Sequence, residues 1–270
     1  MRSPLARRMR AAALLLLAGC ATVPGTGRSQ FRFTSLDMEM SLGEESYESE
    51  LKDAKLITSG ADYEMVQRVG KRIGDAAKRV YPERSSEFAF EIVLIDDPKT
   101  VNAWCMPGGK IAVYTGLLPV TQNEEALAIV VGHEVGHAVA RHGGERMSQD
   151  LAFSVGLGVT ATALSDMKPE EKEAILGALV GVGTFGVLYP FSRTQEAEAD
   201  ELGLYIAAWA GYDPHAAIPL WKRMAEMGGD KPPELLSTHP SDESRIEHMQ
   251  ELMPQAEDMY MQGRRQRGES

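Results

Sequence analysis

Residues His133-Glu-Val-Gly-His137 form an H-E-x-x-H motif inside a long apolar run. Residues four apart share one face of a helix, so both imidazoles of a helical motif can bind one metal ion. Glu134 would then point to the open side of the metal, where a water molecule binds. This is the arrangement of a zinc peptidase, in which the glutamate serves as the general base.

A catalytic zinc ion needs a third protein ligand and leaves its fourth position open. Residues 192–200 read S-R-T-Q-E-A-E-A-D, which places Glu196 and Asp200 four apart on an expected helix. One carboxylate could bind the metal while the other accepts a hydrogen bond from a ligand histidine. A solvated acidic helix face is the alternative, and the charge pattern alone does not exclude it.

The elements before the motif are expected to be one helix and two strands. Apolar residues at helical spacing predict a helix over 66–80, which Pro82 ends. Alternation of apolar residues predicts a strand over 88–94. Pro107-Gly-Gly109 predicts a turn that leads into a second strand over 110–114. The two strands indicate a small sheet.

The motif itself is expected on a helix that Asn123 caps and that Gly143-Gly144 ends after His142. The rest of the chain is almost wholly helical by its pattern. Helices are predicted over 147–165, 169–188, 194–210, 214–228 and 241–253. The predicted fold class is therefore α+β, mostly helical with one small β-sheet.

The first nineteen residues have the pattern of an export signal. Four arginines precede the apolar run Ala11–Ala18, which is too short to span a bilayer. The closing Leu17-Ala-Gly-Cys20 resembles the lipobox of bacterial lipoproteins, which predicts a lipid on Cys20 after cleavage. The alternative is an ordinary secretory signal, with Cys20 in a disulfide to Cys105. Ala21, by resemblance to bacterial sorting rules, favours the outer membrane, with the protein on its periplasmic side.

Length and charge indicate one acidic domain. The formal charge is −11, and removal of residues 1–19 with their four arginines makes it −15. Nucleic acid is therefore not expected as a partner. We expect the lipidated cysteine and a polar tether over 20–34, one domain over 35–262, and a flexible tail over 263–270.

Two predicted helices, 151–164 and 174–189, are rich in Gly, Ala, Val and Leu. Three locations are possible for these helices. They could pack in the core of the domain, or they could lie with an apolar face on the membrane surface. They could also insert into the membrane, because the second helix approaches the length of about 17–25 residues that a span requires.

Four motifs in order resemble a known family. N-A-x-x-x-P-G-G-x-I-x-V-Y-T-G-L-L precedes H-E-x-x-H, and S-R-x-x-E-x-E-A-D and T-H-P-x-x-x-x-R follow it. From about residue 35 to 253 the chain resembles the zinc metallopeptidase family that includes HtpX and the CAAX prenyl protease. Within that family it is most similar to the periplasmic lipoproteins of the LoiP and YfgC type.

The resemblance implies a zincin-type domain that binds one Zn²⁺ ion per chain. It makes His133, His137 and Glu196 the zinc ligands and Glu134 the catalytic base. It places Asp200 behind a ligand histidine as a supporting carboxylate.

The resemblance also bears on the segment Thr238-His239-Pro240. His239 would either occupy the water position of a latent enzyme or stabilise the transition state, whereas a surface histidine is the alternative. Arg245 is expected behind the ligands. Glu198 is assigned no role, and His142 is expected to be structural or to support a ligand. The remaining histidines, at 215 and 248, are given no role, and Cys105 is expected to be a small buried residue.

The strand over 110–114 is expected to be a sheet edge to which an extended substrate could pair. Its candidate groove residues are Lys110, Ile111, Ala112 and Val113, and the resemblance adds Asn102 and Ala103 at the border. Such pairing selects for flexible chain, so the predicted function is a zinc endopeptidase of the bacterial envelope that cleaves misfolded or unassembled envelope proteins. The alternatives are a zinc-binding lipoprotein that assists outer-membrane protein assembly without cutting, and an integral membrane protease.

Overall fold

The computed structural model describes residues 20–163, 191–227, 233–239 and 243–269. Contacts divide the chain into two units, one of residues 1–35 with 143–189 and one of residues 36–142 with 190–270. The expected signal over 1–19 and the expected apolar helix over 174–189 lie outside the described residues.

In the first unit, the segment expected to be a tether contains a β-hairpin. Strand β1 (Cys20–Thr22) pairs antiparallel with β2 (Ser29–Phe31). Arg28 forms a bidentate ion pair with the buried Glu145, with both N–O distances 2.8 Å. Glu145 belongs to α7 (His142–Ala163), which replaces the helix expected over 147–165. Among the described residues, no helix combines the length and apolar character that crossing a membrane requires.

The second unit contains a four-stranded sheet with the order β3-β4-β6-β5. Its strands are β3 (Leu56–Ile57), β4 (Glu91–Ile95), β5 (Ala103–Met106) and β6 (Lys110–Tyr114). β6 has the predicted bounds. The strand predicted over 88–94 is also present, as β4, but it begins and ends later than predicted. β6 pairs parallel with β4 on one side and antiparallel with β5 on the other. The prediction that it is an edge strand is therefore wrong, because β5, which was not predicted, pairs with it.

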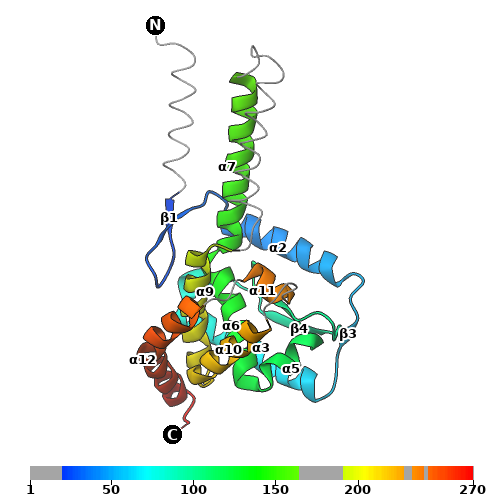
Figure 1. Cartoon of the computed structure of the whole chain (residues 1–270), viewed down its shortest axis with the longest axis vertical. Helices are drawn as coiled ribbons and strands as arrows, with labels where there is room; N and C mark the ends of the chain where they lie inside the picture. Colours follow the sequence, from blue (N-terminus) through cyan, green and yellow to red (C-terminus); the bar gives the residue numbers. More distant parts are fainter. Residues whose placement is uncertain (1–19, 164–190, 228–232, 240–242, 270) are drawn as a thin grey trace. The chain divides into compact units, whose positions relative to one another are not determined.

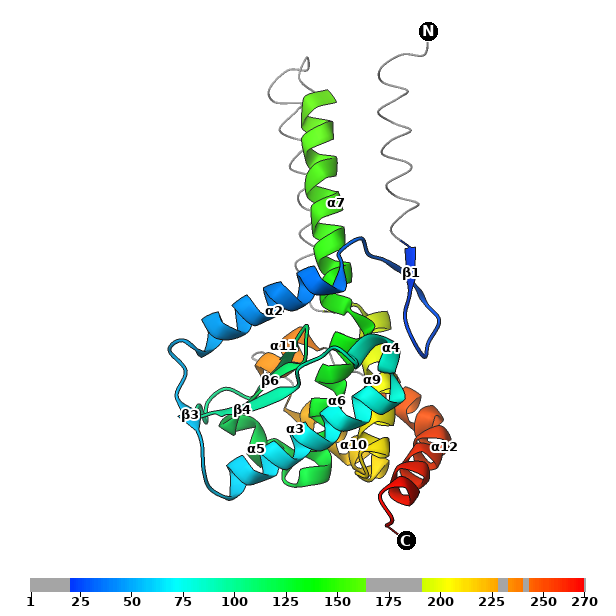
Figure 2. The same ribbon diagram turned by 180° about the vertical axis from the view of Figure 1, so that it is seen from behind.

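The predicted class, mostly helical α+β, is confirmed. The first α-helices of this unit are α2 (Leu36–Leu51), α3 (Ala61–Val80), α4 (Pro82–Ser85), α5 (Leu118–Thr121) and α6 (Glu124–Ala140). The later ones are α9 (Arg193–Trp209), α10 (Ala217–Glu226), α11 (Glu234–Thr238) and α12 (Glu243–Gln266). Two 3₁₀ turns, η1 (Thr115–Leu117) and η2 (Pro214–Ala216), precede α5 and α10. In this unit α3 packs against β4 and α6 against β5, whereas α9 packs against α6 and α12 against α9 (Figure 1; Figure 2).

Helix α6 is the core of this unit, since every residue from Ala126 to Ala140 is buried. Its predicted cap is confirmed: the Asn123 side chain accepts a hydrogen bond of 2.8 Å from the amide of Ala126. The predicted end at Gly143-Gly144 is wrong. Arg141 ends the helix in the left-handed conformation, with φ 58°. A bidentate pair with the buried Glu39 of α2, at 2.8 and 2.9 Å, holds it there, and the two glycines lie inside α7.

Glycines bring α6 and α9 unusually close together. A Cβ atom on Gly136 would lie 2.7 Å from the carbonyl oxygen of Ala199, and one on Gly132 would lie 2.7 Å from that of Gly203. Only hydrogen fits in such gaps, so these positions set the distance between the two helices. The N-terminus of α9 is fixed by a capping box between Ser192 and Gln195.

Helix α12 continues past Pro254, where the sequence predicted an end, and reaches into the expected tail. Met249 and Ala256, on either side of the proline, are both buried, and α12 packs against α9 and α10. Packing therefore outweighs the loss of one backbone hydrogen bond at the proline.

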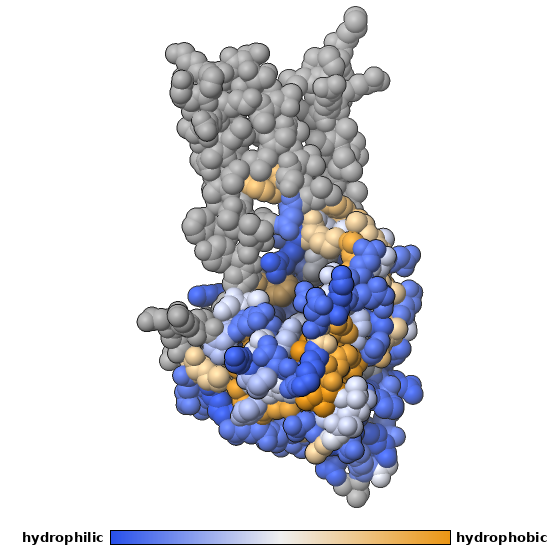
Figure 3. All heavy atoms as spheres, turned by 90° about the vertical axis from the view of Figure 1, so that its right-hand side faces the viewer, coloured by the Kyte–Doolittle hydropathy of each residue, from blue (hydrophilic) through white to orange (hydrophobic). Residues whose placement is uncertain are grey.

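The face drawn in Figure 3 is mostly hydrophilic, with a smaller apolar area among the polar side chains. Large apolar side chains that are more than a third exposed in the described chain are Phe33, Met38, Leu56, Met227 and Met261. Single exposed apolar residues of this kind are common on soluble proteins.

Candidate metal centre

The two histidines of the motif share one face of α6, with their Nε2 atoms 3.1 Å apart. His133 and His137 are 1% and 5% exposed, and Glu134 beside them is 4% exposed. The helix thus presents two imidazoles and a carboxylate inside the protein, as the spacing predicted.

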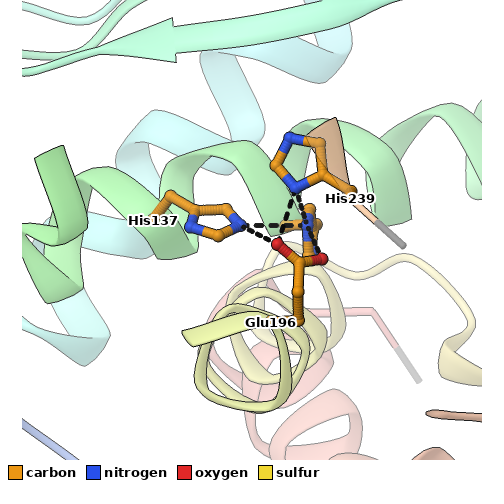
Figure 4. Close-up of side chains that lie close together, drawn as sticks. His137, Glu196 and His239 are labelled. Atoms are coloured by element: carbon orange, nitrogen blue, oxygen red, sulfur yellow. Dashed lines mark hydrogen bonds and ion pairs between the residues drawn. The ribbon is translucent and has the colours of Figure 1, made fainter. Parts of the chain in front are cut away.

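Glu196, on the first turn of α9, brings its carboxylate to the same point. Its Oε1 lies 3.3 Å from Nε2 of His137, and its Oε2 lies 3.5 Å from Nε2 of His133. Figure 4 shows the Glu196 carboxylate rising from α9 towards the imidazole of His137 on α6. The close contact of the two helices makes this reach possible.

His239 completes a group of four. It follows α11, with its backbone amide bonded to the carbonyl of Leu235 at 2.8 Å. Its Nδ1 lies 2.9 Å from Oε1 of Glu196 and 3.2 Å from Nε2 of His133. Its ring enters the site from the side opposite α9 (Figure 4). The side chain of His239 is only 4% exposed, so His239 is not a surface histidine.

The four donor atoms can hold a metal ion. All lie within 4.8 Å of one another, and the closest contacts run from 2.9 to 3.5 Å. Tetrahedral zinc with bonds of about 2.0–2.1 Å separates its ligands by about 3.3 Å. The Oε2 atom of Glu196 is buried and lies 3.3 Å from Nη1 of Arg245 and 3.5 Å from Nε2 of His133. Histidine nitrogen and carboxylate oxygen are the donor types of zinc and similar divalent ions.

Burial and mutual contacts shift the acid–base properties of the group. Burial raises the pKa of Glu134 to about 7. Burial would also raise the pKa of Glu196, but hydrogen bonds with the three histidines hold it far below its usual value. Burial lowers the pKa of His137 well below its usual value. The metal-free site therefore holds Glu196 as a carboxylate and His137 as neutral imidazole, which are the forms that bind a metal.

Asp200 and Arg245 both contact the ring of His133, and Arg245 also lies 3.3 Å from Oε2 of Glu196. Oδ1 of Asp200 is 2.8 Å from Nδ1 of His133. Arg245 donates to both oxygens of Asp200, at 2.5 and 2.6 Å, and its guanidinium stacks 3.5 Å from the ring centre of Trp221. This arrangement fixes the ring of His133, with Nε2 turned to the metal site.

His142, which was expected to be structural or to support a ligand, contacts His137, and Glu198 contacts His142 in turn. Nδ1 of His142 lies 2.8 Å from Nδ1 of His137, and Nε2 of His142 lies 3.1 Å from Oε2 of Glu198. Glu198, which was assigned no role, is buried and therefore belongs to the surroundings of the site. The only signal in the sequence was a third acid between Glu196 and Asp200.

The structure separates the expected groove residues. Ile111, Ala112 and Val113 are buried in the middle of the sheet, and Lys110 pairs with Glu91 at 2.9 Å. The border residues Asn102 and Ala103 are buried at the start of β5, the outer strand of the described sheet, which packs against α6. Cys105 of β5 is a free, half-buried thiol, and Cys20 lies in β1.

The family model for peptidase family M48 matches residues 61–253. A mitochondrial metalloendopeptidase OMA1 of Schizosaccharomyces pombe is 36% identical over 240 residues, which cover 87% of this chain and 67% of the relative. The corresponding metalloendopeptidase of Bos taurus is 35% identical over 86% of this chain and 46% of its own length.

A beta-barrel assembly-enhancing protease of Escherichia coli is 27% identical over 89% of this chain and 49% of the relative. The chain thus spans about half the length of several curated relatives that it matches.

Proposed function

This chain belongs to peptidase family M48 and is a metallopeptidase, and we propose that it is a zinc-dependent endopeptidase whose centre is formed by His133, His137 and Glu196. The observation that carries the proposal is the meeting of these three side chains at distances that suit tetrahedral zinc, with Glu134 beside them. Two nitrogens and one carboxylate oxygen leave a fourth position for water or for His239.

A zinc ion at this site would polarise a peptide carbonyl and make a water molecule a stronger nucleophile near neutral pH. Glu134 would accept the proton of the attacking water and later pass it to the leaving amine. Burial raises the pKa of Glu134 to about 7, which suits a group that must both take and give a proton near neutral pH.

His239 supports a second candidate function, a latent or non-cleaving zinc protein. With four protein donors the site has the closed coordination of structural zinc. Nε2 of His239 also lies 3.6 Å from Oε1 of Glu134, so His239 stands beside the carboxylate of the proposed base. We propose that cleavage requires His239 to leave the ligand set, and that the site is latent until it does.

The proposed substrates are unfolded or misfolded polypeptides. β5 is the outer strand of the described sheet and packs against α6, the helix of Glu134, so an extended chain that pairs with β5 would pass near the site. Strand pairing uses backbone groups, so it favours flexible chain over a particular sequence. The strand proposed to pair with the substrate is therefore β5, in place of β6.

The proposed location is the periplasmic side of the bacterial envelope, with a lipid on Cys20 at the outer membrane. The pattern of an export signal over residues 1–19 and the L-A-G-C sequence support it. The similarity to a bacterial beta-barrel assembly-enhancing protease agrees with a role in envelope quality control, whereas the mitochondrial relatives leave the compartment open. Placement beside HtpX, the CAAX prenyl protease and the LoiP and YfgC lipoproteins is part of this proposal.

Membrane washing tests the anchor. Replacement of Cys20 by Ser should release the protein into the soluble envelope fraction. Retention of Cys20→Ser in washed membranes would contradict the lipid anchor and favour an integral membrane protease.

Cleavage of an unfolded protein, measured together with bound zinc, tests the activity. Glu134→Gln should keep its zinc and lose cleavage, whereas Glu125→Gln, an exposed acid on the same helix, should keep both. If wild type binds zinc but does not cut, His239→Ala decides: new cleavage supports latency, and continued inactivity favours the non-cleaving protein. Absence of zinc from the wild type would refute the metal centre.

A further inference from the structure

We propose that His142 and Glu198 are positioning residues that hold His137 in the tautomer that presents Nε2 to the metal, an inference that rests on the proposed zinc site. Both side chains are buried behind His137, away from the four donor atoms. They form a chain from the Glu198 carboxylate through His142 to His137, with contacts of 3.1 and 2.8 Å.

The direction of the hydrogen bonds follows from proton counting. The carboxylate of Glu198 only accepts, so Nε2 of His142 must carry the proton that it donates. Neutral imidazole has one N–H, so Nδ1 of His142 is then an acceptor. The two Nδ1 atoms are 2.8 Å apart and share one proton, which therefore belongs to Nδ1 of His137.

This assignment leaves Nε2 of His137 without a proton, and Nε2 is the atom that lies 3.3 Å from Glu196 in the metal site. The opposite tautomer would place a proton where the metal binds. A carboxylate behind a ligand imidazole also makes that ligand more basic. The chain therefore selects the ring atom that binds and strengthens it as a ligand.

The other ligand histidine is held by a shorter version of the same arrangement. Nδ1 of His133 reaches Asp200 directly, at 2.8 Å. Helix α9 thus supplies three acids to one centre: Glu196 to the metal, Asp200 to His133, and Glu198 to His137 through His142. The inserted imidazole of His142 spans the gap that the Glu198 carboxylate alone does not cross.

A purely structural role is the competing explanation. His142 begins α7 directly after the turn at Arg141, so its contact with Glu198 could simply tie that turn to α9. A structural tie would change the stability of the metal-free protein and leave the affinity for zinc unchanged. A positioning role must change the affinity.

The experiment measures the zinc dissociation constant by chelator competition, together with the melting temperature of the metal-free protein. The variants are His142→Leu, His142→Asn and Glu198→Gln, with His215→Leu as the control, because His215 is exposed. We expect His142→Leu to weaken zinc binding by about 10–100-fold. His142→Asn can place an amide oxygen near the position of Nδ1 and should recover most of the affinity. Glu198→Gln should fall between wild type and His142→Leu.

Unchanged zinc affinity in all three variants, with or without a lower melting temperature, would overturn the inference. If His142→Leu does not fold, Glu198→Gln decides, because it keeps the volume of the side chain and removes the charge of the carboxylate; wild-type zinc affinity in Glu198→Gln would then overturn the inference. If the wild type binds no zinc, the proposed function itself fails, whereas zinc binding by the wild type with unchanged affinity in the variants contradicts only the positioning role.

Discussion

Replacement of Gly136 by alanine should damage the metal centre without changing any polar group. The new Cβ would lie 2.7 Å from the carbonyl oxygen of Ala199, whereas ordinary contact begins at 3.4 Å. The obstacles are backbone atoms, so no side-chain rotation can relieve the clash. Helices α6 and α9 must separate by about 0.7 Å, which moves Glu196 away from His133 and His137 by more than the tolerance of about 0.5 Å for a functional site.

The sign of the stability change makes this a sharp test. An unobstructed helical Gly→Ala change stabilises by up to about 1 kcal/mol. Overpacking in a dense core costs about 1–3 kcal/mol, so we expect net destabilisation in Gly136→Ala. Urea denaturation of the metal-free protein and zinc titration measure the two effects. Ser46→Ala, at an exposed position of α2, serves as the control for helix propensity.

Wild-type or higher stability of Gly136→Ala, together with unchanged zinc affinity, would refute the reasoning. It would mean that α6 and α9 are not held at the distance that their glycines permit.

Three further predictions concern charge, pH and metal. Glu39→Gln leaves the guanidinium of Arg141 buried without the carboxylate that it pairs with. Urea denaturation should therefore show that the free energy of unfolding falls by about 3 kcal/mol, and a fall of less than about 1 kcal/mol would argue against a buried ion pair. Cleavage should fall as pH drops, because Glu134 must be ionised to act as a base. Burial raises its pKa to about 7 and a bound cation lowers it, so an acid limb well above pH 7 in kcat/KM would contradict this role. With free zinc at one hundred times its dissociation constant, the free energy of unfolding should be about 2.7 kcal/mol higher than without zinc. If zinc stabilises His133→Ala by the same amount, the ion binds elsewhere.

Features that depend on residues close together in the chain could be predicted from the sequence alone. The H-E-x-x-H spacing places His133 and His137 together, because a helix fixes the relation between residues four apart. The cap at Asn123 and the bounds of the strand over 110–114 depend on neighbouring residues, and both are confirmed. The same reasoning brought Glu196 into consideration as a ligand, although it left a solvated acidic face as the alternative.

Tertiary structure decided what depends on residues far apart in the chain. Gly143 looked like a helix end, but the partner that holds Arg141 in the left-handed turn is Glu39, about one hundred residues earlier. β6 is internal because of its pairing with β5, which no local pattern of Lys110–Tyr114 reveals. His142 and Glu198 meet across 56 positions of sequence only because glycines let α6 and α9 approach. The spacing of residues along a helix determines which of them share a face. The packing between helices determines which residues of another helix that face contacts, and the surroundings of the metal centre depend on these contacts.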